Sequence, residues 1–173
     1  MKRIVLRAME PEDLELLYVI ENDPELWEVG STTVPYSRYV LHDYLAHASG
    51  DIYTDRQVRL VIENEAHEAI GLADLLNFDP KHCRAEVGIV IVAAHRGQGY
   101  ATEALSALHD YARLTLHLHQ LYAFVSTANQ PSIALFEKLG YRFSQPLTDW
   151  LFDGHAYSDA LIAQKILGSN TAV

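Results

Sequence analysis

The sequence predicts an α/β fold built on a mixed sheet. Residues 87–92 form an almost wholly apolar run rich in β-branched residues, which is typical of a buried strand. A glycine-containing loop follows, and apolar residues then recur at helical spacing over residues 101–112. The next apolar run, residues 121–125, completes a strand, a helix and a strand, an order that predicts a parallel pair with a right-handed crossover. Alternating segments earlier in the chain predict antiparallel strands, so the sheet is expected to be mixed.

The N-terminal part is expected to hold one strand and two helices. Apolar and polar residues alternate over residues 3–8, as in a half-buried strand. Pro11 stands where a helix can begin, and Asp23-Pro24 is expected to end that helix. Ser37 can cap a second helix, which Gly50 would close.

The remaining elements lie on either side of the central strand, loop and helix. Residues 58–63 alternate and turn through residues 64–68 into residues 69–76, and we expect two antiparallel strands there. Asn129 is predicted to cap a helix that ends at Gly140. Asp153-Gly154 stands between two strand-like segments and predicts a hairpin.

The loop between the central strand and helix reads Arg96-Gly97-Gln98-Gly99-Tyr100-Ala101. At a helix start, backbone N–H groups lack helical acceptors, and together with the helix dipole they favour an anion such as a pyrophosphate. Arg96 adds a guanidinium suited to phosphate. A plain glycine turn explains this segment about as well, because the Walker pattern is missing and Thr102 breaks the dinucleotide fingerprint.

Three stretches together give a resemblance to a known family. Arg96-x-x-Gly99-x-Ala101, after an apolar strand beginning Ala-Glu, resembles the acetyl-CoA loop of the GNAT N-acetyltransferase superfamily. Residues 129–141 are similar to its Asn…Leu-Tyr/Phe-Glu-Lys-x-Gly-Phe/Tyr segment, and residues 4–14 to its first strand and helix. Among subfamilies, the spermidine N-acetyltransferase type is the closest match, through Arg84-Ala-Glu86, residues 115–122 and Phe152-Asp-Gly154.

The resemblance implies a fold and an activity. The expected fold is a single GNAT domain over residues 1–173, a mixed sheet of about seven strands whose central parallel strands splay and which helices flank. The expected activity is transfer of the acetyl group of acetyl-CoA to a primary amine of a small molecule, with a polyamine such as spermidine among the acceptors. Acetylation of a protein or peptide, or a non-catalytic acetyl-CoA-binding module, stays as the alternative.

The resemblance also assigns the residues that bind acetyl-CoA. The backbone of residues 89–91 is expected to pair with the acetyl group and the pantetheine arm, and an N–H there to stabilise the developing oxyanion. Asn129 matches a cofactor-contacting position, although its role as a helix cap would explain it equally well. The full predicted set is Ile89, Val90, Ile91, Arg96, Gly97, Gln98, Gly99, Tyr100, Ala101, Thr102, Asn129, Ser132, Phe136 and Lys138.

The predicted acceptor site consists of Glu28, Tyr36 and Glu86. An amine at neutral pH is mostly ammonium and must lose a proton before it can attack a thioester. Glu86 matches the family's carboxylate near the acceptor and is the predicted catalytic residue, either binding the ammonium or relaying its proton through water. The alternative for Glu86 is a surface carboxylate paired with Arg84.

Two positions depart from the spermidine-type pattern. Phe136 stands where those enzymes carry a tyrosine that protonates the leaving thiolate, so the general acid is open between solvent and other residues, namely Tyr122, Tyr141 and Tyr157. The acidic positions that flank Pro-Tyr in those enzymes are here Thr33, Val34 and Ser37, around Pro35-Tyr36. This second departure weakens the expectation of polyamine specificity and of polyamine-driven assembly.

Composition limits the classes of partner. The 173-residue chain has a net charge of −10, which argues against nucleic acid as a ligand. No apolar run approaches the ~20 residues that a membrane span needs, and Cys83 is the only cysteine, so we expect a cytoplasmic enzyme. We also expect a homo-oligomer, with a dimer as the first possibility, and no metal, since His117 and His119 on a last helical turn would not face each other.

Acidic residues are concentrated near the N-terminus, with no Lys or Arg among them. This run can be a solvated helix face, or it can supply a field that attracts a cationic acceptor. Its members are Glu10, Glu12, Asp13, Glu15, Glu21, Asp23, Glu25 and Glu28.

Overall fold

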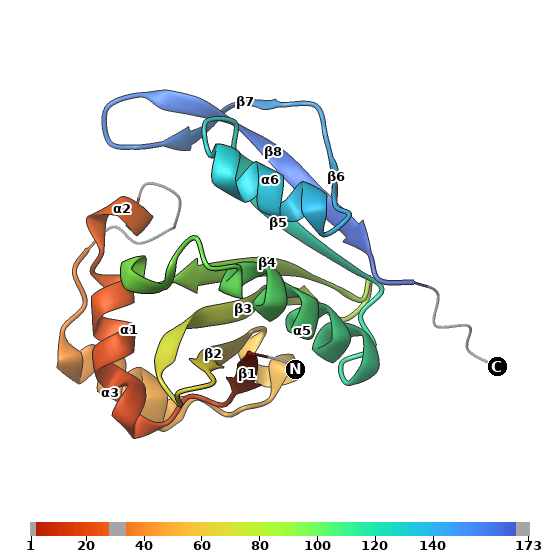
Figure 1. Ribbon diagram of the computed structural model, residues 1–173. Helices are drawn as coiled ribbons and strands as arrows, with labels where there is room; N and C mark the ends of the chain where they lie inside the picture. Colours follow the sequence, from red (N-terminus) through yellow and green to blue (C-terminus); the bar gives the residue numbers. More distant parts are fainter. Residues whose placement is uncertain (1–2, 28–33, 169–173) are drawn as a thin grey trace. The chain divides into compact units, whose positions relative to one another are not determined.

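The computed structural model describes residues 3–27 and 34–168, which divide into two compact units. The first unit holds residues 3–9, 49–123 and 164–168, and the second holds residues 10–27, 34–48 and 124–163. Within the described residues, eight strands form one mixed sheet in the order β1-β2-β3-β4-β5-β8-β6, with β7 paired to β8 (Figure 1). The mixed α/β fold is confirmed, whereas the single-domain assignment stays a prediction.

The strands of the first unit follow one another along the chain. β1, β2, β3 and β4 are antiparallel in turn, as the alternating segments predicted, and β5 then runs parallel to β4. Consecutive residues of β2, Val61 and Ile62, are both fully buried, so this strand lies in the interior on both faces. The bounds are β1 (Ile4–Arg7), β2 (Val58–Asn64), β3 (Ala69–Asp79), β4 (Arg84–Ile91) and β5 (Gln120–Ser126).

The parallel pairing of β4 with β5 within the first unit is short. Its register pairs Arg84 with Gln120 and ends at Glu86 opposite Tyr122. β4 itself continues to Ile91, where it is still paired with Gly71 of β3. Glu86 therefore lies on the middle one of three paired strands, at the last registered position of the parallel pair.

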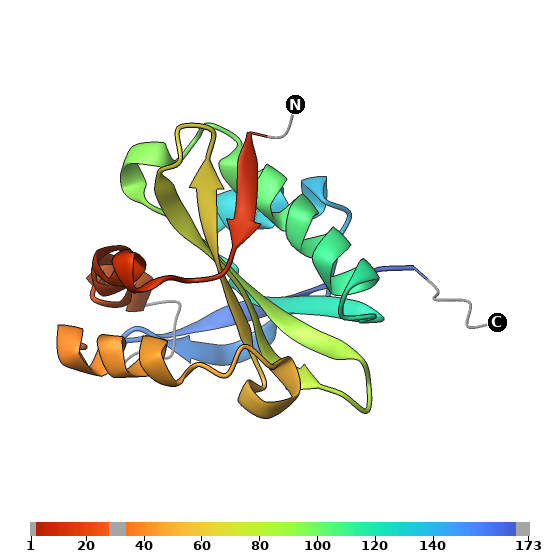
Figure 2. The same ribbon diagram turned by 90° about the horizontal axis from the view of Figure 1, so that it is seen from below.

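Helix α5 (Tyr100–Leu114) packs along β1, β3 and β4 (Figure 2). Its inward stripe is fully buried, as its helical spacing predicted, and consists of Ala104, Leu105, Leu108 and Ala112. The first unit also holds a short helix that the sequence did not predict, α4 (Ile52–Asp55), which the Asp51 side chain caps. Four residues are too few to produce a helical period.

In the second unit, caps fix the helix starts that the sequence predicted. The Ser37 hydroxyl accepts a hydrogen bond from the Val40 N–H (3.2 Å), and α3 begins at Arg38. That helix ends at His47, with Ala48 as its cap, and so stops before Gly50. The helical elements are the 3₁₀ helix η1 (Pro11–Asp13), α1 (Leu14–Glu21), α2 (Pro24–Trp27), α3 (Arg38–His47) and α6 (Gln130–Lys138).

The predicted hairpin at Asp153-Gly154 is present. β7 (Leu147–Phe152) pairs antiparallel with β8 (Tyr157–Ile166), and Gly154 has φ 96° at the turn. The Asp153 carboxylate accepts hydrogen bonds from the His155 and Ala156 N–H groups. The strand absent from the prediction is β6 (Arg142–Phe143), because two residues cannot show an alternating pattern.

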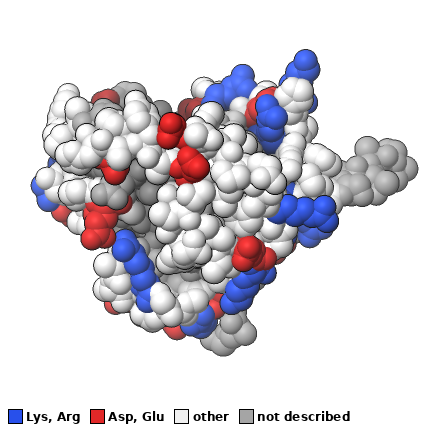
Figure 3. Space-filling view, turned by 90° about the horizontal axis from the view of Figure 1, so that it is seen from above, with Lys and Arg blue, Asp and Glu red and all other residues white. Residues whose placement is uncertain are grey.

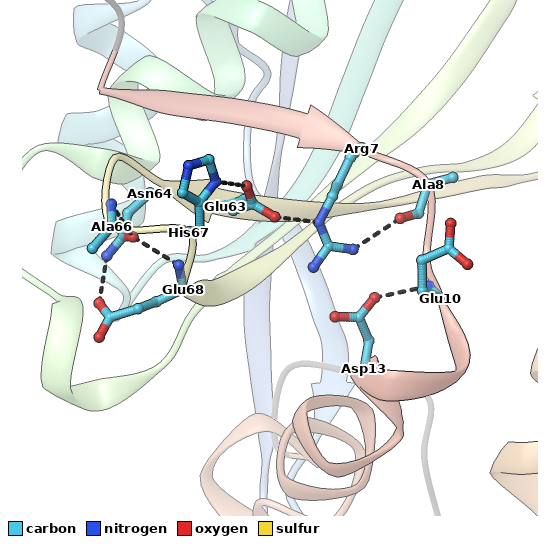
Figure 4. A network of polar contacts seen from close by, with 9 residues as sticks. All are labelled: Arg7, Ala8, Glu10, Asp13, Glu63, Asn64, Ala66, His67 and Glu68. Carbon is cyan, nitrogen blue, oxygen red and sulfur yellow. Dashed lines mark hydrogen bonds and ion pairs between the residues drawn. The ribbon is translucent and has the colours of Figure 1, made fainter.

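Ion pairs between charged side chains connect neighbouring strands. Figure 4 shows Arg7 of β1 reaching the Glu63 carboxylate of β2, which also contacts the His67 ring (Nδ1–Oε1 2.8 Å). The hydrogen bonds from His67 and Arg7 lower the pKa of Glu63. On the face drawn in Figure 3, basic and acidic side chains are interspersed and form no basic stripe. Among the described residues, no helix is both long and apolar enough to cross a bilayer.

Candidate active site

The glycine loop after β4 has the backbone that the sequence predicted. Gly97 and Gly99 have φ values of 76° and 87°, in the left-handed region that side chains disfavour. A Cβ atom on Gly97 would meet no atom within 4 Å, so this part of the loop surface is open. A Cβ atom on Gly99 would instead lie 3.2 Å from the Arg3 guanidinium. The second glycine therefore makes room for a side chain of this protein.

Arg3 holds the loop from outside. Its Nη2 donates to the Gln98 carbonyl oxygen (3.2 Å), its Nε donates to Glu103 (2.6 Å), and its guanidinium lies over the Tyr100 ring, 5.0 Å from the centroid. The sequence does not indicate this contact, because nothing local links positions 95 apart in the chain. The only available signal was a basic residue in the first strand, which is too general to indicate a contact.

Arg96 holds the loop from inside. Its Nε donates to the Ile91 carbonyl oxygen at the end of β4 (2.8 Å), and the Gln98 side chain donates to the Ala94 carbonyl oxygen (3.3 Å). A 3₁₀ helix, η2 (Ala93–His95), connects β4 to this loop. The Arg96 guanidinium is thus fixed beside the loop, where it was predicted to bind phosphate.

These features fit the pyrophosphate of acetyl-CoA. The first turn of α5, which starts at Tyr100, leaves backbone N–H groups without helical acceptors, and the open face at Gly97 gives an anion access to them. The positive end of the helix dipole lies at the same place. The roles of Gln98, Ala101 and Thr102 as individual cofactor contacts stay predictions.

Residues 89–91 of β4, which are predicted to pair with the acetyl group, are held along one edge by pairing with β3. Residues 89–91 are registered against β3, with Val90 opposite Leu72 and Ile91 opposite Gly71. A Cβ atom on Gly71 would lie 2.1 Å from the Val90 carbonyl oxygen, so the close approach of the two strands requires glycine. Sequence analysis passed over Gly71, although an isolated glycine inside a strand pattern is a signal of close backbone approach.

Glu86 contacts Asn77 and not Arg84, the partner considered from the sequence. The Asn77 side-chain amide donates to Glu86 Oε2 (2.7 Å), whereas the guanidinium of Arg84 is paired with Asp79 (Nη2–Oδ2 3.2 Å). The pairing of Glu86 with Arg84 is therefore wrong, whereas the catalytic role of Glu86 stays a prediction. Glu86 is half-buried and contacts a neutral donor. The positive charge of Arg84, on the same strand, therefore does not neutralise the Glu86 carboxylate.

Tyr122 faces Glu86 across the parallel pair. The two residues are registered partners, and such partners project their side chains on the same face of the sheet. Burial and, after it, the negative charge of Glu86 raise the pKa of the Tyr122 phenol. A phenol is protonated at neutral pH without this shift, and the raised pKa makes Tyr122 a weaker acid.

The other tyrosines considered as general acids lie in the second unit. Tyr141 is buried, its pKa is raised by burial, and its ring meets that of Phe136 edge to face, with centroids 4.8 Å apart. Tyr157 is largely exposed and packs on Phe152 in the hairpin. The assignment of the general acid stays open between these tyrosines, Tyr122 and solvent.

The second unit also contains the predicted cofactor residues of α6. The Asn129 side-chain oxygen accepts from the Ser132 N–H (3.1 Å), so its role as the cap of this helix is confirmed, and cofactor contact stays a prediction. Phe136 is buried, and Lys138 is exposed in the last turn. No geometry at these positions tests their predicted contacts with acetyl-CoA.

The predicted acceptor residues near the N-terminus are placed only in part. The Tyr36 backbone is clamped by Asn22, whose side chain accepts from the Tyr36 N–H (2.8 Å) and donates to its carbonyl oxygen (3.1 Å). Sequence analysis did not foresee this clamp. Glu28 and Thr33 lie outside the described residues, so their predicted roles stay untested.

Several members of the acidic N-terminal run have structural partners. Glu15 forms a two-point ion pair with Arg38 (2.7 and 2.9 Å), which lowers the pKa of Glu15. Asp13 is buried and accepts from the Glu10 N–H (2.8 Å). Asp13 is therefore not part of a solvated face, whereas Glu15 is exposed and already has a cationic partner.

The histidines after α5 do not occupy the helical turn expected of them. α5 ends at Leu114, and His117, at φ 54°, and His119 lie in the connection to β5. The expected placement of these histidines on a last helical turn is therefore wrong. Among the described residues, no group of three metal-ligating side chains comes together.

Comparison with known proteins identifies the family. The family model of the acetyltransferase (GNAT) domain matches residues 3–142. The spermidine N(1)-acetyltransferase of Escherichia coli K12 is 31% identical over 160 residues, covering 91% of this chain and 83% of that protein. Its counterpart from Vibrio cholerae is 27% identical over 157 residues, with 91% of this chain and 89% of that protein covered.

Solved structures agree with the sequence relatives. The crystal structure of spermidine N-acetyltransferase from Vibrio cholerae in complex with CoA and spermine has a TM-score of 0.85 at 25% identity, covering 96% of this chain and 97% of that chain. A dodecameric structure of the same enzyme in an intermediate state has a TM-score of 0.80 at 26% identity, covering 96% and 95%. The resemblance drawn from the loop and helix motifs is confirmed: this chain belongs to the GNAT acetyltransferase family and is an acetyl-CoA-dependent N-acetyltransferase.

Proposed function

We propose that this enzyme acetylates a primary amine of a small polycation, a polyamine such as spermidine, and that Glu86 is its acceptor-side carboxylate. The observation that carries the proposal is the half-buried Glu86, held by a neutral amide while the nearby Arg84 is paired elsewhere. A carboxylate that keeps its charge attracts an ammonium group. The relatives named as spermidine acetyltransferases support the choice of acceptor.

Glu86 would serve the amine in two ways. As an anion it binds the ammonium form of the amine at the end of the parallel pair and so orients the amine for attack. As a base it accepts the proton that the amine must lose, directly or through one water molecule. Both tasks need an ionised carboxylate without a cationic partner of its own.

The donor side of the proposed site consists of β4 and the glycine loop. Acetyl-CoA, when bound, supplies the acetyl group as an activated thioester. The loop over residues 96–102 would hold its pyrophosphate, and the backbone of Ile89, Val90 and Ile91 would orient the acetyl end. A backbone N–H of this strand would donate to the oxygen on which charge develops.

A panel of amines tests the proposed acceptor. Release of free thiol from acetyl-CoA is measured with polyamines, amino acids and peptides at equal concentration. We expect the highest kcat/KM with a polyamine. Preference for a peptide N-terminus or a peptide lysine would instead favour protein acetylation, and acetyl-CoA binding without thiol release from any amine would favour a non-catalytic module.

Substitution of Glu86 tests its proposed role. Glu86→Gln keeps the shape and should lower kcat/KM for the amine about ten-fold or more, as the loss of a general acid–base group does. The dissociation constant of acetyl-CoA, measured by calorimetry, should not change. Arg84→Gln is the matched control, since that guanidinium is held by Asp79, and full activity of Glu86→Gln would leave Glu86 a structural carboxylate.

The assembly and the location of the enzyme are further parts of the proposal. We propose a homo-oligomer, for which the description of a relative as dodecameric is the support, and a dimer is its smallest form. Light scattering coupled to gel filtration measures the mass, and a monomer at micromolar concentration would contradict it. A cytoplasmic location fits the use of acetyl-CoA as donor and stays a prediction.

A further inference from the structure

The ladder between β3 and β4 contains one extra residue close to Glu86. The strands are in regular register as far as Leu76 opposite Glu86, and the next registered pair is Asp79 opposite Arg84. Asn77 and Phe78 of β3 therefore face the single residue Ala85 of β4. This two-against-one arrangement is a β-bulge, and bulges re-aim side chains at the edges of regular pairing.

The backbone of the bulge determines which side chain turns outward. Asn77 has φ 49°, a left-handed conformation that asparagine tolerates better than most residues. Phe78 next to it stays buried, with its ring edge-to-face on Tyr53 at 5.1 Å. The bulge thus keeps an aromatic anchor in the core and leaves Asn77 exposed beside Glu86.

Asn77 in the bulge and Asp79, the next residue in register, contact the two charged side chains of β4 separately. Asn77 donates to Glu86 Oε2 at 2.7 Å, and Asp79 pairs with Arg84 at 3.2 Å. The N–H of His82 donates to Asp79 and lowers its pKa, so Asp79 stays ionised and able to hold Arg84. Arg84 and Glu86 project from the same face because they are two apart on one strand. Without their contacts to Asp79 and Asn77, these two side chains would pair with each other.

We infer that Asn77 is a positioning residue for catalysis, holding the Glu86 carboxylate toward the acceptor through the β3 bulge. The inference rests on the proposed role of Glu86. An amide donor fixes one carboxylate oxygen without cancelling the negative charge, which a lysine or arginine at this place would do. The other oxygen is left for the ammonium group of the acceptor.

Asn77→Gly is the variant that separates the amide from the backbone. Glycine adopts a left-handed conformation without strain, so the substitution deletes the donor and keeps the bulge. The loss of one hydrogen bond to a charged group should lower kcat/KM for the amine about ten-fold. The KM for acetyl-CoA should not change. His67→Gly is the control, since His67 also has a left-handed backbone (φ 60°) but contacts Glu63, and it should keep full activity.

A double-mutant cycle tests whether Asn77 acts through Glu86. If it does, adding Asn77→Gly to Glu86→Gln should change kcat/KM less than about two-fold, because the group that it positions is already disabled. Independent losses that multiply in the double variant would overturn the inference. Asn77→Gly with full activity beside an impaired Glu86→Gln would overturn it too, while leaving the role of Glu86 intact.

Two further outcomes are separable from these. Full activity of Glu86→Gln would remove the proposed function of Glu86, and the inference with it. If Asn77→Gly does not fold, Asn77→Asp keeps a residue that tolerates the left-handed conformation and replaces the donor by a like charge. It should lose at least as much activity as expected for Asn77→Gly, and wild-type activity of Asn77→Asp would overturn the inference.

Discussion

At the scale of single residues, Phe136 separates this enzyme from the spermidine-type pattern. It is buried against Tyr141, and it has no proton to give to a departing thiolate. An ordinary thiol has a pKa near ~8.5, so its anion is a fair leaving group without help. We therefore expect slow but real turnover in the wild type.

The variant Phe136→Tyr tests this expectation. It adds one hydroxyl at a position where the resemblance to the spermidine-type enzymes implies a tyrosine, and it should raise kcat if that hydroxyl reaches the sulfur. Steady-state thiol release with the best acceptor measures the change, and Phe136→Leu, which adds no hydroxyl, is the control. An unchanged kcat would mean that protonation of the thiolate is not the limiting step.

At the scale of elements, the glycine loop depends on the first strand. Arg3 reaches from the start of β1 to the loop carbonyl at Gln98 and to Glu103 in the first turn of α5. The hydrogen bond to Gln98 and the pairing with Glu103 fix the loop in a conformation that can meet a phosphate. A substitution at Gly99 would act first on this contact, since its Cβ would meet Arg3.

Arg3→Gln should therefore weaken acetyl-CoA binding without touching the acceptor. Losing these contacts should raise the KM for acetyl-CoA about five-fold, the effect of roughly one net hydrogen bond. The KM for the amine should stay constant. Arg3→Lys, which keeps the charge but not the fork of donors, should recover part of the affinity; an unchanged KM for acetyl-CoA in both variants would exclude the loop contact from cofactor binding.

Helix α5 also carries a buried titratable group. Burial, with Lys165 adding to it, lowers the pKa of His109 from 6.5 to about 4. The unfolded chain then binds a proton between about pH 6.5 and 4 that the folded chain does not, so stability falls as the pH falls through this window. The whole shift corresponds to roughly 3 kcal/mol.

Urea unfolding at pH 7 and pH 4 measures this dependence. We expect the wild type to lose much of its free energy of unfolding at the lower pH. His109→Leu should show a smaller loss over the same range, because it cannot bind a proton in the unfolded state. Equal pH dependence in the two proteins would place the acid sensitivity on other groups, such as the Arg-paired carboxylates.

The elements were predictable where the pattern was long and the caps local. The stripe of α5 and the Asn129 cap depend on residues within one or two turns, and both are as the sequence predicted. The partner of Glu86 was not predictable, because β3 is buried on both faces and its sequence gives no sign that one residue is inserted at Asn77. The contact of Arg3 with Gln98 was missed for a different reason, since it joins segments that only folding brings together.

At the scale of the whole molecule, acidic residues remain in excess after pairing. Six arginines of the described residues form ion pairs with acids, namely Arg3–Glu103, Arg7–Glu63, Arg38–Glu15, Arg59–Asp74, Arg84–Asp79 and Arg113–Asp110. With 23 acidic against 13 basic residues, the surplus acids set a negative field around the protein. Such a field favours a polycationic acceptor over a singly charged one.

Ionic strength should therefore act selectively on the acceptor. Raising salt from about 0.01 to 0.15 M shortens the screening length from about 30 to 8 Å. The kcat/KM for spermidine should fall more steeply with salt than that for a monoamine of similar length, measured by thiol release. Parallel salt dependences for the two amines would remove the field as a source of preference.

The contact between Gly71 and the Val90 carbonyl oxygen limits how this enzyme can be redesigned. β3 carries Asn77, which contacts the predicted acceptor-side carboxylate Glu86, so a search for new acceptors by substitution would reach this strand. Gly71 lies on the same strand, and any side chain there would push against the backbone of Val90, which is expected to meet the acetyl group. A library that varies β3 should hold Gly71 fixed, so that altered acceptor preference is not confused with a displaced donor.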